Sequence, residues 1–198
     1  MTSLLELIKA KQETLEPADV MVLPQRPEML LIGCVDARKD PMGDLGIPRG
    51  KALILRNVAA LVHPEAEGRL TESAALAFAV REVKVKHVAV MGHTACGGIR
   101  AAINGSPSYS LRDYLSPINI MKERVCAHVD GIDEQAAKLE REAVKYSVRA
   151  LRTYDYITAA EGNGDLQLHG WVIDIATGII HVWDEKTDTF APMAKPAI

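Results

Sequence analysis

Cysteine is scarce in this chain, which argues against a fold built on disulfides. Only 3 of the 198 residues are cysteine, and so small and odd a number favours a reducing compartment. The formal net charge of -3 gives no reason to expect binding to nucleic acid or to an anionic membrane surface. No apolar run approaches the roughly 20 residues of a membrane span, and the N-terminus does not read as a signal peptide. We therefore expect a cytoplasmic globular protein with no nucleic-acid or membrane partner.

The remaining composition is that of an ordinary globular domain. Hydrophobic residues make up 48% of the chain and charged residues 25%, and the length is enough for a substantial core. The sequence shows no internal repeat and no domain boundary, so we expect a single domain over residues 1–198. Within it, an amphipathic helical pattern near the start predicts an arm over residues 1–24, followed by a core over 25–198.

Apolar runs separated by a helical pattern predict a parallel sheet. Residues 29–34, 52–58 and 87–92 are short and apolar, as is typical of strands buried on both faces. Residues 71–83 carry apolar side chains at helical spacing. Strand, helix and strand within about forty residues form a βαβ unit, whose strands are parallel.

The second half of the chain changes from helices to strands. Residues 111–151 follow a helical pattern with interruptions at Ser116-Pro117 and Asp130-Gly131. Residues 166–175 and 179–183 then read as two strands joined by a turn. The predicted fold is an α/β domain with a mostly parallel central sheet, flanking helices, a C-terminal antiparallel hairpin and an N-terminal helical arm.

Two short motifs supply three ligands of the kind that zinc binds. They are Cys34-Val35-Asp36-Ala37-Arg38 and His93-Thr94-Ala95-Cys96-Gly97-Gly98. A lone cysteine or histidine more often has only a packing role. Cys34 and His93, however, follow directly on two predicted parallel strands, whose carboxyl ends meet at one sheet edge. Three protein ligands leave the fourth zinc position to water, as in catalytic sites.

Asp36 and Arg38 stand two residues apart, which places both side chains on the same side of an extended segment. A guanidinium can fix the orientation of a carboxylate by paired hydrogen bonds. On a protein surface such an ion pair contributes little. Directly after a metal-binding cysteine, we expect it to serve the metal site as a catalytic pair.

At these residues the chain resembles the β-class carbonic anhydrases. The resemblance runs from about residue 25 to 184, and the paired zinc motifs are its most specific part. The other matching segments are Arg56-Asn57-Val58-Ala59, residues 73–80 and Leu166-Gln167-Leu168-His169-Gly170-Trp171-Val172. Ala37 and Ala60 replace a serine and an asparagine common in the family, but neither change removes a metal ligand.

The resemblance implies reversible hydration of carbon dioxide to bicarbonate by zinc-bound hydroxide. It implies Zn²⁺ on Cys34, His93 and Cys96, the catalytic pair Asp36–Arg38, and a pocket at the interface of a dimer or tetramer. For that pocket it implies the substrate-binding residues Gln25, Leu53, Val58, Phe78 and Gly97.

Two alternatives stay open at this stage. The same fold could hydrolyse a related linear substrate, carbon disulfide or carbonyl sulfide. The chain could also be a non-catalytic zinc or redox-regulated binding module, marked by a fourth side-chain ligand or a broken Asp36–Arg38 pair. Asp36 could be that ligand in a resting state, and we predict a switch in which it binds zinc at lower pH and is released to Arg38 at higher pH. The sequence identifies no proton shuttle: His63, His87 and His128 qualify only by residue type, and we expect them at the surface.

Overall fold

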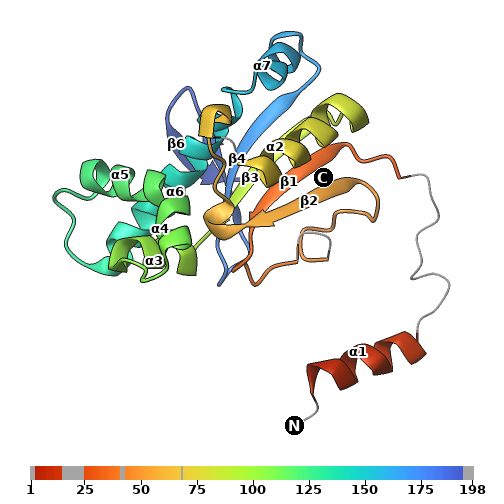
Figure 1. The fold of residues 1–198 in the computed structure, drawn as a ribbon, viewed down its shortest axis with the longest axis horizontal. Coiled ribbons are helices and arrows are strands. Elements are labelled where there is room, and N and C mark those ends of the chain that lie inside the picture. Colours follow the sequence, from red (N-terminus) through yellow and green to blue (C-terminus); the bar gives the residue numbers. More distant parts are fainter. Residues whose placement is uncertain (1–2, 15–24, 41–42, 68, 194–198) are drawn as a thin grey trace.

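A six-stranded sheet forms the centre of the protein (Figure 1). The computed structural model describes residues 3–14, 25–40, 43–67 and 69–193. The strands are β1 (Met29–Cys34), β2 (Ala52–Asn57), β3 (His87–His93), β4 (Gln167–Ile173), β5 (Ile180–Asp184) and β6 (Thr189–Pro192), in the order β2-β1-β3-β4-β5-β6. Strands β1 to β4 are parallel to one another, whereas β5 is antiparallel to both β4 and β6. The mostly parallel sheet with a C-terminal antiparallel hairpin is thus confirmed, with β6 as an additional strand at the edge.

The helices follow the predicted pattern with two differences. They are α1 (Leu4–Glu13), α2 (Leu70–Ala77), α3 (Gly97–Asn104), α4 (Tyr109–Tyr114), α5 (Ser116–Val125), α6 (Ile132–Leu151) and α7 (Asp155–Gly162). Of the two predicted interruptions, Ser116-Pro117 marks the start of α5, directly after α4, and Asp130-Gly131 directly precedes α6. The helix predicted over 71–83 changes at Phe78–Val83 into a π-helical segment, which ends at the left-handed residue Lys84. The short helix α7 was not predicted.

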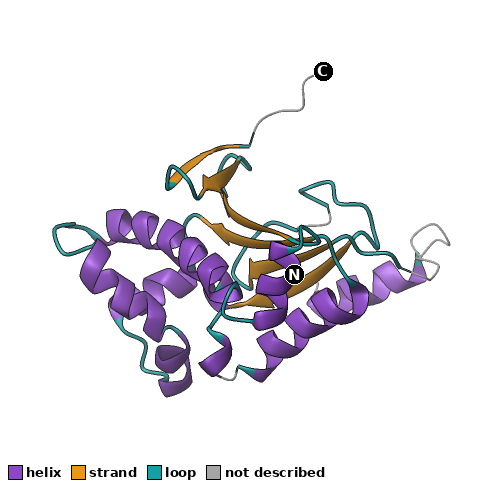
Figure 2. Cartoon of the chain, turned by 90° about the horizontal axis from the view of Figure 1, so that it is seen from above, coloured by secondary structure: helices purple, strands orange, loops and turns teal. Residues whose placement is uncertain are grey.

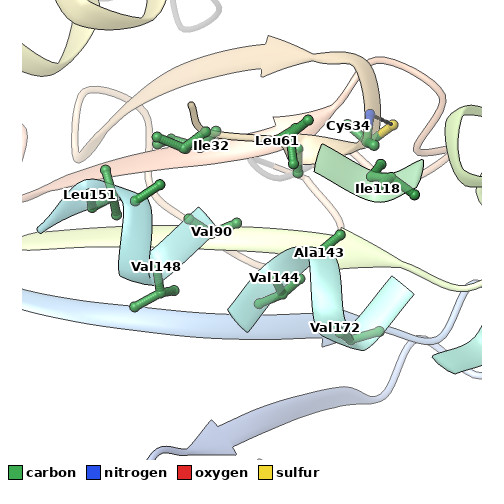
Figure 3. Packing of buried hydrophobic residues seen from close by; sticks show 14 of the residues in the cluster. Ile32, Cys34, Leu61, Val90, Ile118, Ala143, Val144, Val148, Leu151 and Val172 are labelled. Atoms are coloured by element: carbon green, nitrogen blue, oxygen red, sulfur yellow. Dashed lines mark hydrogen bonds between the residues drawn. The ribbon is translucent and has the colours of Figure 1, made fainter. Parts of the chain in front are cut away.

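The two faces of the sheet are covered unequally. Figure 2 shows helices along one side of the strands, and α2, α3, α5, α6 and α7 each contribute residues to the main core cluster. The main core lies between that face and the helices, and Figure 3 shows Ile32, Val90 and Val144 packed within it. On the opposite face a smaller apolar cluster contains Leu31 and Met91.

Strand order explains why distant parts of the sequence meet at one edge. From the central strand β1 the chain moves to β2 on one side and then crosses to β3 on the other. The carboxyl ends of β1 and β3 therefore flank a topological switch point, where open α/β sheets bind their ligands. Cys34 is the last residue of β1 and His93 the last residue of β3, as predicted.

Helix α1 stands apart from this body in Figure 1. Ser3 and Glu6 form a capping box at its start, and none of its residues is buried. This confirms the helical pattern near the start of the chain, whereas the rest of the predicted arm, residues 15–24, lies outside the described residues. No helix in the described ranges combines the length and the apolar character needed to cross a bilayer.

Candidate metal centre

Cys34, His93 and Cys96 converge into one buried cluster. Their ligand atoms all lie within 4.8 Å of one another, and each residue is at most 2% exposed. The sulfurs of Cys34 and Cys96 are 3.8 Å apart. Two thiolates bound at about 2.3 Å to a tetrahedral zinc stand about 3.8 Å from each other. The sulfur positions therefore fit one shared zinc ion.

The histidine ring presents the nitrogen that a metal needs. His93 Nδ1 lies 2.9 Å from the carbonyl oxygen of Thr94, which can only accept a hydrogen bond. The Nδ1 proton is thereby assigned, and Nε2 carries the free lone pair. His93 Nε2 is buried and has no hydrogen-bond partner within the described residues. A buried nitrogen without a partner is costly, and a metal ion at this point would satisfy it.

The charges of the two cysteines also favour a cation. The hydrogen bond from Cys96 and the neighbouring His93 lower the pKa of Cys34 to about 4, despite burial. The hydrogen bond to Cys34 and burial raise the pKa of Cys96. Without a cation the pair readily takes one negative charge but resists the second. Binding of Zn²⁺ supplies the positive charge that stabilises both thiolates.

Asp36 lies beside this cluster and is held from two sides. Its Oδ2 accepts a hydrogen bond from the Gly97 backbone N–H at 2.7 Å, and its Oδ1 lies 3.5 Å from Arg38 Nη1. The same Oδ2 is 3.9 Å from His93 Nε2. Arg38 is anchored further by donating to the Ala95 carbonyl at 3.3 Å. The predicted Asp36–Arg38 pair is thus formed, at the side of the cluster that faces the start of α3.

Two contacts around the ligands were not predicted from the sequence. The Ala59 N–H donates to the Cys34 sulfur at 3.3 Å, and Glu140 accepts the Cys96 N–H at 3.0 Å. Glu140 is 5% exposed, and burial raises its pKa. Glu140 lies on the apolar side of α6, at helical spacing from Ala136 and Ala143. An acidic residue on an apolar helix face was the feature of the sequence that could have identified it.

The predicted pocket residues fall into two groups. Val58 follows β2 directly and lies within contact distance of the N-terminal turn of α3, which contains Gly97. Gln25 is exposed and precedes β1, at the opposite end of that strand from Cys34. Leu53 pairs with Leu30, also toward that opposite end. Phe78 is 54% exposed. Within one chain, only Val58 and Gly97 are therefore placed at the cluster.

The expected surface position of His63 was wrong. His63 is fully buried, where its ring contacts Glu72 and the Tyr114 carbonyl, whereas His128 is exposed as predicted. The surface position was expected from residue type alone. The hydrogen-bonding partners that make its burial possible come from two separate helices, and a local pattern does not reveal them.

Comparison with known proteins agrees with this geometry. A family model described as carbonic anhydrase matches residues 29–180. The chain is 31% identical over 182 residues to beta carbonic anhydrase 6, mitochondrial, from Arabidopsis thaliana, an alignment that covers 88% of this chain and 62% of that protein. The chain therefore spans less than two thirds of the length of this relative.

Solved structures of similar fold lead to the same family. A β-carbonic anhydrase from Sordaria macrospora, described as tetrameric, is 29% identical with a TM-score of 0.74 and covers 86% of this chain and 84% of its own. The β-carbonic anhydrase CcaA reaches a TM-score of 0.81 at 22% identity, covering 96% of this chain and 84% of its own. At that identity the second comparison supports the fold alone.

Proposed function

The chain belongs to the β-class carbonic anhydrase family, and on that premise we propose that it catalyses the reversible hydration of carbon dioxide to bicarbonate and a proton. The observation that carries this proposal is the buried cluster of Cys34, His93 and Cys96 with an oriented carboxylate, Asp36, beside it. A structural zinc site would instead be closed by a fourth side chain. Asp36 is engaged by Arg38 and Gly97, which supports the catalytic interpretation.

Zn²⁺ is the cofactor that these residues fit, through Cys34 Sγ, Cys96 Sγ and His93 Nε2. When bound, zinc lowers the pKa of a water molecule and so supplies a nucleophile near neutral pH. The protein contributes the ligands, their orientation and their surroundings. The Thr94 carbonyl fixes the His93 ring, and Glu140 fixes the backbone at Cys96.

Asp36 orients the attacking oxygen. Each carboxylate oxygen has two acceptor positions, so Oδ2 can bind the Gly97 N–H and still accept a hydrogen bond from the nucleophile. Arg38 keeps the carboxylate from rotating by holding Oδ1. The nucleophile then directs a lone pair, rather than a proton, toward the carbon of carbon dioxide. Val58 supplies an apolar wall next to this position.

We propose further that the pocket is completed by a second copy of the chain. Gln25, Leu53 and Phe78 match family pocket positions but lie away from the cluster of their own chain. At about 3.3 Å per residue, β1 alone separates its two ends by about 16 Å. A partner subunit that presents its own Gln25, Leu53 and Phe78 would bring them to the site.

Two exposed apolar surfaces support such self-association. Helix α1 exposes Leu4, Leu7 and Ile8. The sheet face opposite the main core carries a groove of about 500 Å³, whose apolar lining includes Met29, Leu45, Ile47, Trp171, Ile180 and Met193. Exposed apolar patches on soluble proteins commonly mark interaction sites. We propose that α1 of one copy packs into this groove of another, in a dimer or tetramer.

A cytoplasmic location remains a proposal. Its support is that none of Cys34, Cys96 and Cys126 forms a disulfide, which suits a reducing compartment. Fractionation of the source cells, followed by detection of the protein in each fraction, tests it.

Stopped-flow measurement of carbon dioxide hydration tests the activity. We expect the zinc-loaded protein to accelerate the reaction, and the metal-free protein to be inactive until zinc is restored. Carbon disulfide and carbonyl sulfide should be assayed in parallel. Turnover of either one without hydration of carbon dioxide would establish the alternative hydrolase, and a zinc-loaded protein inactive on all three substrates would contradict the enzyme.

A further inference from the structure

Behind the metal cluster lies a second group of buried polar side chains, which the proposed reaction does not use. It consists of Glu72 on α2, His63, Tyr114 at the end of α4, and Asn57 at the end of β2. Glu72 is 4% exposed and His63 is fully buried. Burying charged groups is costly unless they are paired, so this group, called here the Glu72 cluster, requires an explanation.

Glu72 is the centre of the cluster. Its Oε2 accepts the His63 backbone N–H at 3.1 Å and lies 3.2 Å from His63 Nδ1. Its Oε1 accepts the Tyr114 hydroxyl at 2.7 Å and the Asn57 amide at 3.5 Å. Burial tends to raise the pKa of Glu72, but the hydrogen bonds from His63 and Tyr114 outweigh it and lower the pKa. A charged carboxylate thus holds three groups at once.

These contacts clamp both ends of the segment 57–63. The Leu61 carbonyl accepts a hydrogen bond from the Asn57 amide at 2.8 Å. It also lies 3.1 Å from the Tyr114 hydroxyl, whose single proton it shares with Glu72. His63, at the far end, is fixed through its backbone and ring to Glu72. Leu61 itself is anchored in the main core, near Ile32 in Figure 3.

Between the clamped ends the backbone is strained. Ala59 and Ala60 have φ angles of 62° and 52°, a left-handed conformation that non-glycine residues disfavour because of their Cβ. Two such residues in succession persist only when surrounding contacts enforce them. This turn brings the Ala59 N–H to 3.3 Å from the sulfur of Cys34, which also accepts the Asp36 N–H at 3.4 Å.

We propose that Glu72 is a positioning residue for the metal centre. Through Asn57 and Tyr114, which both reach the Leu61 carbonyl, and through His63, it holds the left-handed turn at Ala59. It thereby holds the N–H···S hydrogen bond to Cys34. Hydrogen bonds to a ligating thiolate withdraw electron density from sulfur and fix its position, so they tune how the metal is bound. The inference rests on the proposed function for its metal site, but its test does not depend on turnover.

The test compares Glu72→Gln with wild type in two measurements. One is the thiolate-to-metal charge-transfer absorption of the cobalt(II)-substituted protein, and the other is the dissociation constant for zinc. Glutamine has the shape of glutamate but cannot accept hydrogen bonds at both ends. We expect a shifted band and zinc binding weakened about tenfold. Glu82→Gln, at an exposed position, is the matched control and should change neither measurement.

A rescue variant separates positioning from general destabilisation. Glycine adopts the left-handed conformation without steric cost, so Ala59→Gly should restore the turn in the Glu72→Gln background. We expect the charge-transfer band and the zinc affinity of the double variant to return toward wild type. Relief of strain at a left-handed residue also stabilises the fold as a whole, so Lys84→Gly in the same background, at a left-handed residue outside the Glu72 cluster, is the control and should not restore the band.

The outcomes are distinct. An unchanged band and zinc affinity in Glu72→Gln, or no rescue by Ala59→Gly, overturns the inference. Should Glu72→Gln fail to fold, Tyr114→Phe provides the same test, since it removes only the hydroxyl that binds Glu72 and Leu61. A shift in the same direction supports the inference, and an unchanged spectrum overturns it. The proposed function fails separately, if zinc-loaded wild type does not hydrate carbon dioxide.

Discussion

The backbone N–H of Gly97 donates to Asp36 Oδ2 at 2.7 Å, which links the start of α3 to the carboxylate beside the metal cluster. A methyl group at residue 97 would stand 3.1 Å from that same oxygen. Glycine is therefore required here for close approach and not for an unusual backbone angle. The oxygen bound to Gly97 is also the one closest to His93 Nε2.

Gly97→Ala should displace Asp36 by a few tenths of an ångström while leaving the three ligands in place. We expect about a tenfold loss of carbon dioxide hydration, because small errors in positioning are costly in catalysis, together with a full zinc content. Stopped-flow assay and metal analysis measure both. Gly162→Ala, where an added Cβ meets nothing within 4 Å, should retain full activity. Full activity in Gly97→Ala would contradict the positioning role.

Asp36→Asn should bind zinc but hydrate carbon dioxide about 100-fold more slowly, since an amide has one acceptor oxygen instead of two and holds the nucleophile in a poorer orientation. The measurement is the hydration rate per bound zinc. Asp130→Asn, at an exposed position, serves as the matched control. If Asp36→Asn lost its zinc instead, Asp36 would be acting as a metal ligand.

Cys34→Ser should lose zinc and activity together. The substitution removes one of two thiolates from a site with only three protein ligands, and a hydroxyl is a poor ligand for zinc. Metal analysis after dialysis gives the zinc content. Cys126→Ser changes the third cysteine, which is not part of the cluster, and we expect it to retain both zinc and activity. Stoichiometric zinc in Cys34→Ser would show that the ligands are assigned wrongly.

Because of Glu72, the free energy of unfolding should fall as the solution becomes acidic. The pKa of Glu72 in the folded protein is lowered below the ordinary value of 4.5. Its stabilising effect is therefore present above about pH 4.5 and is lost as the pH falls through the folded-state pKa. Urea unfolding of metal-free protein should show wild type more stable than Glu72→Gln at pH 7, with the difference narrowing in acid. A difference that stays constant with pH would contradict the charged state of Glu72.

Replacing both Leu7 and Ile8 by glutamate should weaken self-association. These side chains are 57% and 50% exposed on α1, and we propose that they pack against another copy of the chain. Sedimentation velocity is expected to show a shift toward monomer. Lys9→Glu makes the same change of charge on a different face of this helix and should leave the distribution unchanged. A wild-type protein that sediments only as a monomer would contradict the proposed assembly.

The sequence alone identified the three residues of the candidate metal centre for a physical reason. Cys34 and His93 end apolar runs, and parallel strands place their carboxyl ends at one sheet edge whatever the details of packing. Cys96 follows His93 by three residues and is carried to the same place. The parallel direction of the first strands and the C-terminal hairpin were likewise predicted from the pattern of apolar residues. The four-residue strand β6 is too short for such a pattern to be visible.

Only the tertiary structure decided which polar groups are buried and what they hold. Glu72 and Tyr114 are 42 residues apart, and each looks ordinary in its own segment, yet they meet behind Cys34 and fix the turn at Ala59. Periodicity reports which face of an element is apolar, because that depends on neighbours three or four residues away. Whether a buried acid finds its donors depends on how separate helices pack, and that information is not local.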